Sequence, residues 1–328
     1  MRIVAILAVI AIHTTTRMLE ASSFNLQGYS LTLFINQASR FAVPLFFMIS
    51  GFVLELNYSF NQSYLGYLQK RLSKIFLPYF FWSIIYYFFV YTKHTISFFQ
   101  TLLVGAASYQ LYFIPTLLIF YVIFPLIHRN YRLIANKWIL IILGLFQLFL
   151  LYQEYYIRPL PYFYPVSIAL LNFYIFILGM VFSHHLNFLQ KIGKWTILLT
   201  ILFGIFAIIL FLEGKLFYLK TNNYLYFYSQ WRPSVFFYSI IVGGLFYIIF
   251  NKYRLSLKII PSLSRLSFSV FFIHVIVLES LWYAFGKNIF LNTQEIWFNL
   301  LFFFCVASIS YAIAYFAHKI PYLSKLSG

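Results

Sequence analysis

Apolar runs of about 17 to 25 residues, each long enough to cross a lipid bilayer as a helix, recur along most of this chain. In hydrocarbon every backbone polar group must be paired within its own segment, so repeated runs of this kind predict helices. The fold class is therefore predicted to be all-α, a polytopic transmembrane helical bundle of about ten spans. The predicted spans are 3–19, 40–57, 75–92, 109–127, 135–152, 166–183, 195–212, 233–250, 266–284 and 296–317.

Composition agrees with a membrane protein. Hydrophobic residues make up 63% of the chain and charged residues 9%, which is far from the average of soluble proteins. The net charge of +17 would suggest a nucleic-acid partner in a soluble protein. Here the cations lie mainly in short loops between apolar runs, where they determine topology and contact anionic lipids. We therefore expect membrane lipids and no nucleic acid as partners, and a single membrane domain over 1–328.

The loop charges also predict an orientation. When the spans alternate in direction, the larger share of Lys and Arg lies on the side of the N-terminus. The positive-inside rule then makes both termini cytoplasmic, which agrees with an even number of spans. The stretch 95–108 is too short for a span and is expected to be interfacial or re-entrant. The lone cysteine, Cys305, lies in an apolar run and allows no internal disulfide.

The first predicted span contains three titratable or cationic groups. Arg2 and His13 are close to a whole number of helical turns apart, so they lie on nearly one face, with His13 about 16 Å above Arg2. Arg17 follows one turn later, and the intervening threonines (14–16) make the outer third polar, as if it lined a water-accessible pocket. A histidine here could simply bond a neighbouring helix, with the arginines as interfacial anchors. An imidazole near mid-membrane is costly, however, which favours a functional role.

Five stretches, taken in order, resemble the acyltransferase-3 membrane family. They are Arg2 to His13, Val43 to Phe52, Arg71 to Pro78, Gln110 to Pro115 and Ser267 to His274. The first resembles the family's motif of arginine or lysine, ten residues and histidine. The others are similar to its second-span signature ending in Ser-Gly-Phe, its cytoplasmic basic box before a proline that opens the third span, its aromatic motif, and its late serine-to-histidine motif. Each stretch alone is weak evidence, but the ordered set spans nearly the whole chain.

The resemblance implies an integral-membrane O-acyltransferase of the bacterial cytoplasmic membrane. Such proteins move an acyl group, usually acetyl, from cytoplasmic acyl-CoA to a hydroxyl of an envelope glycan. Acyl-CoA is a donor substrate, so no permanently bound cofactor is expected; the expected partners are the glycan acceptor and separate glycan-synthesis proteins. One alternative is a polysaccharide exporter or flippase, which would need a continuous polar path but no thioester chemistry. Another is an inactive scaffold in a glycan-synthesis complex.

The chemistry needs a base for the acceptor hydroxyl and a cationic site for the CoA phosphates. His13 suits the base, with Arg2 as its catalytic neighbour, because imidazole titrates near neutral pH. A covalent acyl-histidine remains an open alternative. Arg2, Arg71 and Lys74 are expected to bind the CoA phosphates, although each taken singly could be a plain positive-inside anchor. Lys74 stands where the family commonly has arginine, and it lacks the bidentate fork of a guanidinium.

Other candidates have looser assignments. Arg17 and Arg40 could face the acceptor or the incipient oxyanion, and Arg40 at the outer end of its span could equally be an interfacial cation. Ser267 and His274 are seven residues apart on one helical face and are expected to pack against the first span. Glu279 lies on a different face of that span.

The chain contains no Asp, so any carboxylate partner of His13 must be a Glu. Glu55 and Glu279 are the two inside predicted spans. The remaining histidines are expected at span ends (His184, His185 and His318) or in loops (His94 and His128). None has ligand spacing, so no metal site is expected. Ser50 and Gly51 are expected to let two helices approach closely rather than to act as a nucleophile and its partner.

Overall fold

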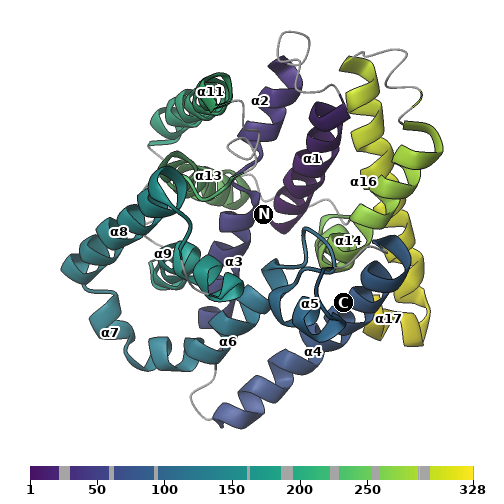
Figure 1. Ribbon diagram of the computed structural model, residues 1–328. Coiled ribbons are helices and arrows are strands. Elements are labelled where there is room, and N and C mark those ends of the chain that lie inside the picture. The colour runs from purple at the N-terminus through teal and green to yellow at the C-terminus, as the bar shows by residue number, and fades with distance from the viewer. Residues whose placement is uncertain are drawn as a thin grey trace. The chain divides into compact units, whose positions relative to one another are not determined.

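The computed structural model describes residues 1–21, 30–58, 63–91, 95–160, 163–185, 195–221, 229–252, 259–286, 288 and 296–327. Every regular element in these ranges is helical (Figure 1). Nine helices of the described chain are long and apolar enough to cross a membrane, and Phe113–Arg129 is a shorter apolar helix. The all-α polytopic class predicted from the sequence is confirmed.

The chain divides into two compact units. The first contains Met1–Phe46 and His185–Tyr315, and the second contains Phe47–His184 and Phe316–Gly328. Helices of the first unit are α1 (Arg2–Ala21), α2 (Ser30–Ala38), α11 (Thr196–Thr221), α13 (Pro233–Lys252), α14 (Ile259–Leu281) with the π-helical turn η4 (Trp282–Gly286), and most of α16 (Ile296–Lys319). Within this unit α1 packs against α2 and α14, and α11 packs against α2 and α13.

The second unit contains the remaining helices. They are most of α3 (Ala42–Leu56), α4 (Tyr64–Ile85) with η1 (Tyr86–Val90), α5 (Phe98–Val104), α6 (Phe113–Arg129), α7 (Tyr131–Ile134), α8 (Lys137–Tyr152) with η2 (Gln153–Ile157), α9 (Tyr164–His184) and α17 (Pro321–Ser327). Here α6 packs against α4 and α9, and α8 also packs against α9.

The second span begins earlier than predicted. The structure has an apolar helical segment over Ser30–Leu56, interrupted only by the turn between α2 and α3, where the prediction was 40–57. The reason is that Asn36, Gln37 and Arg40 interrupt the apolar run in the sequence. All three side chains are buried and bonded within the protein, so their polarity does not mark the end of the span.

The third span also begins earlier. Helix α4 starts at Tyr64, with Ser63 as its N-cap accepting from Gly66 N–H, whereas the predicted start was residue 75. Arg71 and Lys74 therefore lie on the helix rather than in a loop, and Pro78 lies inside the helix rather than at its start. A helix can continue through these charges because Lys74 is exposed while Ile75 on the same turn is buried.

The stretch 95–108 forms the short helix α5 followed by turns. Ser97 and Gln100 form a reciprocal capping box at its start, and Gly105 ends it at φ +72°. A side chain at Gly105 would also collide with the backbone of Tyr112. The hydroxyl of Tyr79 on α4 donates to the Leu102 carbonyl and so joins α5 to α4 within the second unit.

Two glycines let α3 and α9 cross at close range, as predicted for Gly51. A Cβ on Gly51 would overlap the Phe176 carbonyl oxygen, and one on Gly179 would overlap the Met48 carbonyl oxygen. Next to this crossing Phe120 of α6 stacks on Phe176 with 4.5 Å between ring centroids. Backbone contact of this kind is the usual way in which small residues join helices in membranes.

Candidate active site around His13

Helix α1 runs unbroken from Arg2 to Ala21, so Arg2 and His13 lie about three turns apart on it, as predicted. His13 is half-buried, and its ring stacks on that of His274 of α14, with 5.4 Å between centroids and 29° between planes. The expected packing of α14 against the first span is therefore present.

His274 itself is fully buried, and its Nδ1–H donates to the Val270 carbonyl at 3.0 Å. That bond places the lone pair of a neutral ring on Nε2, which has no hydrogen-bond partner among the described residues. Ser267 is also buried, and its hydroxyl donates to the Leu263 carbonyl of its own helix at 3.2 Å. The pair predicted from the serine-to-histidine motif thus supplies a ring surface to His13 and a hydroxyl bonded within α14.

Arg17 is not a lone interfacial anchor. Its guanidinium forms an ion pair with Glu279 of α14 and a second, at 3.4 Å, with Glu20. It also lies over the ring of Tyr283, 5.9 Å from the centroid. Because the Glu279 side chain is only 9% exposed, loss of Arg17 would leave a buried carboxylate without this guanidinium. The structure therefore joins two sequence candidates, Arg17 and Glu279, at one place.

Arg40 lies in the turn between α2 and α3 and is buried, which corrects its expected place at the outer end of a span. Its Nη2 donates to the Oδ1 of Asn36. Arg40 is also close enough to His13 for the two groups to interact electrostatically. A buried cation beside the proposed base is the arrangement expected of a group that stabilises developing negative charge.

Asn36 was not among the sequence candidates, yet it connects this cation to α1. Its amide Nδ2 donates to the Ile12 carbonyl at 3.1 Å, to Thr15 Oγ1 at 2.9 Å and to Thr16 Oγ1 at 3.0 Å. The side chain is completely buried. A polar residue inside an apolar run is the signal that could have found it.

The polar network continues from Asn36 to Arg232, the residue before α13, and to α11. Gln37 donates to Asn36 Oδ1 at 3.1 Å and accepts from Nη2 of Arg232, which is fully buried. Arg232 in turn lies 3.5 Å from a carboxylate oxygen of Glu213, which is on α11, one residue beyond the predicted span 195–212. These bonds hold a second buried arginine in the unit that contains His13.

The threonines after His13 are less exposed to water than predicted. Thr14 and Thr15 are both buried. Their hydroxyls donate to carbonyls one turn back, Thr14 to Ile10 at 2.9 Å and Thr15 to Ile12 at 3.1 Å. Much of the polarity of this stretch is therefore satisfied by the helix itself and by Asn36.

The three cations expected to bind the CoA phosphates belong to different units. Arg2 is exposed at the start of α1 in the first unit. Arg71 and Lys74 lie one turn apart on α4 in the second unit, where the Arg71 guanidinium is 5.9 Å from the ring centroid of Tyr67. Each remains a candidate within its own unit.

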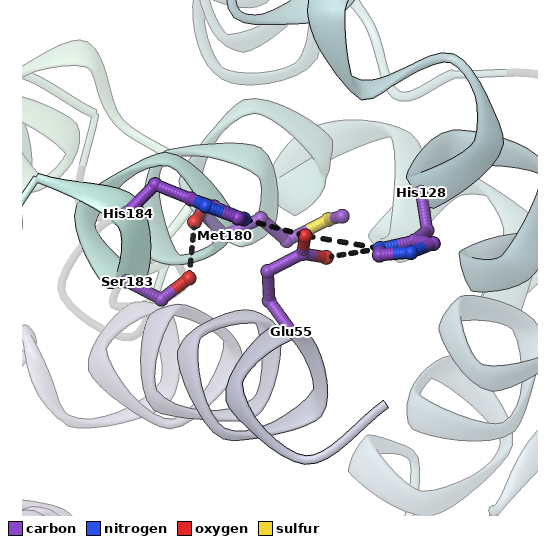
Figure 2. Close-up of polar contacts among 5 residues, drawn as sticks. All are labelled: Glu55, His128, Met180, Ser183 and His184. Atoms are coloured by element: carbon purple, nitrogen blue, oxygen red, sulfur yellow. Dashed lines mark hydrogen bonds and ion pairs between the residues drawn. The ribbon is translucent and has the colours of Figure 1, made fainter. Parts of the chain in front are cut away.

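A cluster that sequence reasoning missed lies in the second unit (Figure 2). Glu55 accepts from His128 Nδ1 at 3.0 Å and from His184 Nε2 at 2.7 Å. His128 is in the last turn of α6, not in a loop as expected, and His184 is the last residue of α9, at a span end as expected. No short motif contains the three residues, because they come from three helices. His185 is exposed, and His94 lies outside the described residues.

In this cluster the Glu55 carboxylate is held by hydrogen bonds from the two imidazoles. Figure 2 shows the two imidazoles approaching the Glu55 carboxylate from opposite sides. Within the described ranges no group of three or more His, Cys, Asp or Glu side chains could hold a metal ion.

Comparison of the chain with models of known protein families supports the family that the five sequence motifs resemble. The family model described as an acyltransferase domain, that of the acyltransferase-3 family, matches residues 1–318. Neither a curated protein nor a solved structure matches the chain. The match extends over both compact units as far as residue 318 and includes all the candidate residues named above. The chain therefore belongs to the acyltransferase-3 family and is a multi-pass membrane acyltransferase.

Proposed function

We propose that this acyltransferase is an O-acetyltransferase of the bacterial cytoplasmic membrane. It moves an acetyl group from cytoplasmic acetyl-CoA to a hydroxyl of an extracytoplasmic or lipid-linked polysaccharide, and both its termini are cytoplasmic. The observation that supports this best is the placement of His13, an ionisable group inside a membrane span, beside His274 and the buried Arg40.

In this mechanism His13 is the general base. Its imidazole takes the proton of the acceptor hydroxyl while the hydroxyl oxygen attacks the thioester carbonyl carbon. The carbonyl oxygen becomes an oxyanion, which the guanidinium of Arg40 stabilises. When the tetrahedral intermediate collapses, the carbon–sulfur bond breaks, the acetyl ester remains on the glycan, and CoA leaves as a thiolate. Arg40 is effective because Asn36 fixes it in a buried, low-dielectric position.

Other cations bind the two substrates. Arg2, Arg71 and Lys74 supply positive charge for the CoA phosphates at the cytoplasmic surface. Arg17, held by Glu279, faces the polysaccharide acceptor at the opposite end of α1. Acetyl-CoA is bound as a substrate and leaves as CoA each cycle, so no permanently bound cofactor takes part.

The test uses the purified protein in liposomes with labelled acetyl-CoA on the side equivalent to the cytoplasm. We expect label to leave CoA and to arrive on an envelope-glycan extract with the native protein and not with His13→Ala. His318→Ala, a histidine with no assigned role near the end of α16, is the matched control and should transfer normally. If the native protein neither binds CoA nor moves label while glycan crosses the membrane, the protein is an exporter and His13 lines its path.

A further inference from the structure

Four side chains of the first unit meet near the ends of α1 and of the continuous helix formed by α14 and η4. This Tyr283 cluster consists of Arg17, Glu20, Glu279 and Tyr283. The two helices run in the same direction, since His13 stacks on His274 and Arg17 pairs with Glu279 further along both. With the N-terminus inside, as proposed above, the Tyr283 cluster lies toward the extracytoplasmic surface.

The ring of Tyr283 is held in place but accessible. Its neighbour Trp282 is buried and packs against Phe302 of α16, with 5.8 Å between ring centroids, which fixes this turn. The Arg17 guanidinium lies 5.9 Å from the centroid of the Tyr283 ring, yet 72% of Tyr283 stays exposed. An aromatic face carries a negative quadrupole, and the C–H face of a pyranose ring is apolar with slightly positive hydrogens. Tyr283 therefore has the chemistry of a stacking platform for a sugar.

Polar groups that can bind sugar hydroxyls lie beside the ring. Arg17 donates from Nη1 to Glu20 at 3.4 Å and from Nη2 to Glu279. A guanidinium has five N–H groups, so one on each terminal nitrogen remains for another partner. Glu20 is exposed, and in the part of the chain that the structure describes one of its two carboxylate oxygens is bonded, to Arg17. The cluster thus presents both donors and an acceptor, which is what a hydroxyl group requires.

The charges of the cluster determine which sugars fit. Among its described side chains one guanidinium faces two carboxylates, those of Glu20 and Glu279. The positive charge of Arg17 is therefore already matched, and a carboxylate or phosphate on a sugar would meet two like charges. A hydroxyl or acetamido group carries no charge and meets no such repulsion. The Tyr283 cluster favours an uncharged sugar over an acidic one.

The cluster is placed to deliver a hydroxyl to His13. Arg17 lies one turn, about 6 Å, beyond His13 along α1. Tyr283 lies roughly 13 Å along its helix beyond His274, the residue whose ring stacks on His13. A glycan that extends from Tyr283 toward His13 would pass Arg17 and cover this distance with a short run of sugar units. All of these residues belong to the first unit.

We propose that the Tyr283 cluster is the acceptor subsite of this acyltransferase and that it takes an uncharged pyranose. Its role as an acceptor subsite rests on the proposed acetyl transfer to a polysaccharide. Tyr283 stacks on the C–H face of the sugar, Arg17 donates to one hydroxyl oxygen, and Glu20 accepts from another hydroxyl. Glu279 does not touch the sugar and is the positioning residue of Arg17.

The kinetic test changes the stacking ring. The acceptor is the fraction of the envelope-glycan extract that does not bind an anion-exchange resin. We expect Tyr283→Ala to raise the KM for this fraction about 3- to 10-fold, with kcat and the KM for acetyl-CoA unchanged. Tyr283→Trp restores an aromatic face and should keep the native KM. Trp297→Ala is the matched control, because Trp297 of α16 is an equally exposed aromatic residue, at 73%, in the same unit.

A second test addresses the charge of the acceptor. When the uncharged fraction and the acidic, resin-bound fraction are offered together, we expect the native protein to place the label mainly on the uncharged glycan. Glu20→Gln removes one negative charge and should raise transfer to the acidic fraction about 1.5- to 5-fold at low salt. Native transfer mainly to the acidic fraction would overturn the assignment to an uncharged pyranose.

A tyrosine that only anchors the protein at the membrane surface would give a different result. Tyr283→Ala would then leave the acceptor KM unchanged, or change it no more than Trp297→Ala does. Either result would overturn the subsite. A KM that rises in Tyr283→Trp as much as in Tyr283→Ala would also overturn it, because the aromatic face would then have no effect on binding.

Binding measured without a donor separates this proposal from the proposed function. The native protein in detergent is dialysed against the uncharged fraction carrying a fluorescent label. Glycan affinity that falls about 3- to 10-fold in Tyr283→Ala supports the sugar site even if no acetyl transfer is detected, and the proposed acetyl transfer alone then fails. His13-dependent transfer together with a glycan affinity that Tyr283→Ala leaves unchanged overturns the subsite alone.

Discussion

His13 and His274 lie ring against ring, 5.4 Å between centroids, in two helices that are 261 residues apart in the sequence at this point. The first residue is half-buried, while the second is buried and bonded through Nδ1 to its own helix. This asymmetry gives the two histidines different roles. In the proposed mechanism His13 exchanges the proton, and His274 supplies the ring surface against which His13 packs.

The ring contact between His13 and His274 predicts that stability and transfer depend more on the ring shape of His274 than on its nitrogen atoms. His274→Phe should keep most of the stability and of the transfer rate, because it preserves a buried ring against His13. His274→Ala should lower the free energy of unfolding by about 2–5 kcal/mol through the cavity it leaves. Thermal unfolding in detergent, together with the transfer assay, measures both. A His274→Phe protein that is stable but inactive would show that the free Nε2 takes part in the chemistry.

We expect Asn36 to contribute to both stability and turnover, although its side chain carries no charge. Asn36→Leu removes an acceptor of buried Arg40 and the contacts that Asn36 Nδ2 makes with α1, so it should cost about 1–3 kcal/mol of stability. In the surviving protein kcat should fall while the donor KM stays unchanged, because the proposed mechanism has Arg40 act on the oxyanion rather than on donor binding. Asn57→Leu is the control, since Asn57 is exposed and its side-chain amide donates to the Val53 carbonyl of its own helix. A fall of donor affinity instead of kcat would contradict the assignment.

The ion pair of Arg17 and Glu279 should be coupled. Arg17→Met leaves the buried Glu279 carboxylate without its guanidinium partner and should destabilise the protein by about 1–3 kcal/mol. The double variant Arg17→Met with Glu279→Leu should be more stable than Arg17→Met alone, because no buried charge is then left unpaired. A double-mutant cycle on the unfolding midpoint measures the coupling. Strictly additive effects would show that the pair does not interact.

Arg71 should affect donor binding. Arg71→Ala should raise the KM for acetyl-CoA with a smaller change in kcat, because a phosphate contact made equally in the ground and transition states changes binding alone. Lys137→Ala removes an exposed cation at the start of α8 in the same unit and should leave the KM unchanged. An unchanged KM in Arg71→Ala would remove Arg71 from the phosphate site.

The close crossing of α3 and α9 gives a prediction with an internal control. Gly51→Ala should destabilise the protein by about 1–3 kcal/mol or more, because the new methyl group meets the Phe176 backbone, which cannot move aside cheaply. Gly204→Ala on α11 meets nothing within 4 Å and should be neutral or stabilise by about 0.5–1 kcal/mol. Unfolding of both variants in the same detergent provides the comparison, and equal stabilities would contradict the packing argument.

Sequence patterns predicted the helices well and their ends poorly. Apolar length is a local property, so the eighth span, 233–250, matches the apolar helix at Pro233–Phe250. The predicted second and third spans began too late because polar residues precede the predicted starts within the helices. These are Asn36 and Gln37 in the second span and Lys70, Arg71 and Lys74 in the third. A polar side chain in sequence does not reveal whether it faces water or a buried partner.

By itself the sequence determined the all-α membrane class, the approximate spans and the motif that contains Arg2 and His13. Bilayer thickness and helical rise set the length of an apolar run that can cross the membrane, and such a run is visible in consecutive residues alone. Tertiary structure decided which polar groups meet. Asn36 bonds residues of α1 more than twenty positions away, and Glu55 bonds His128 and His184 at separations of 73 and 129 residues. Such partners are chosen by helix packing, which no local pattern records, and burial then makes each pairing energetically necessary.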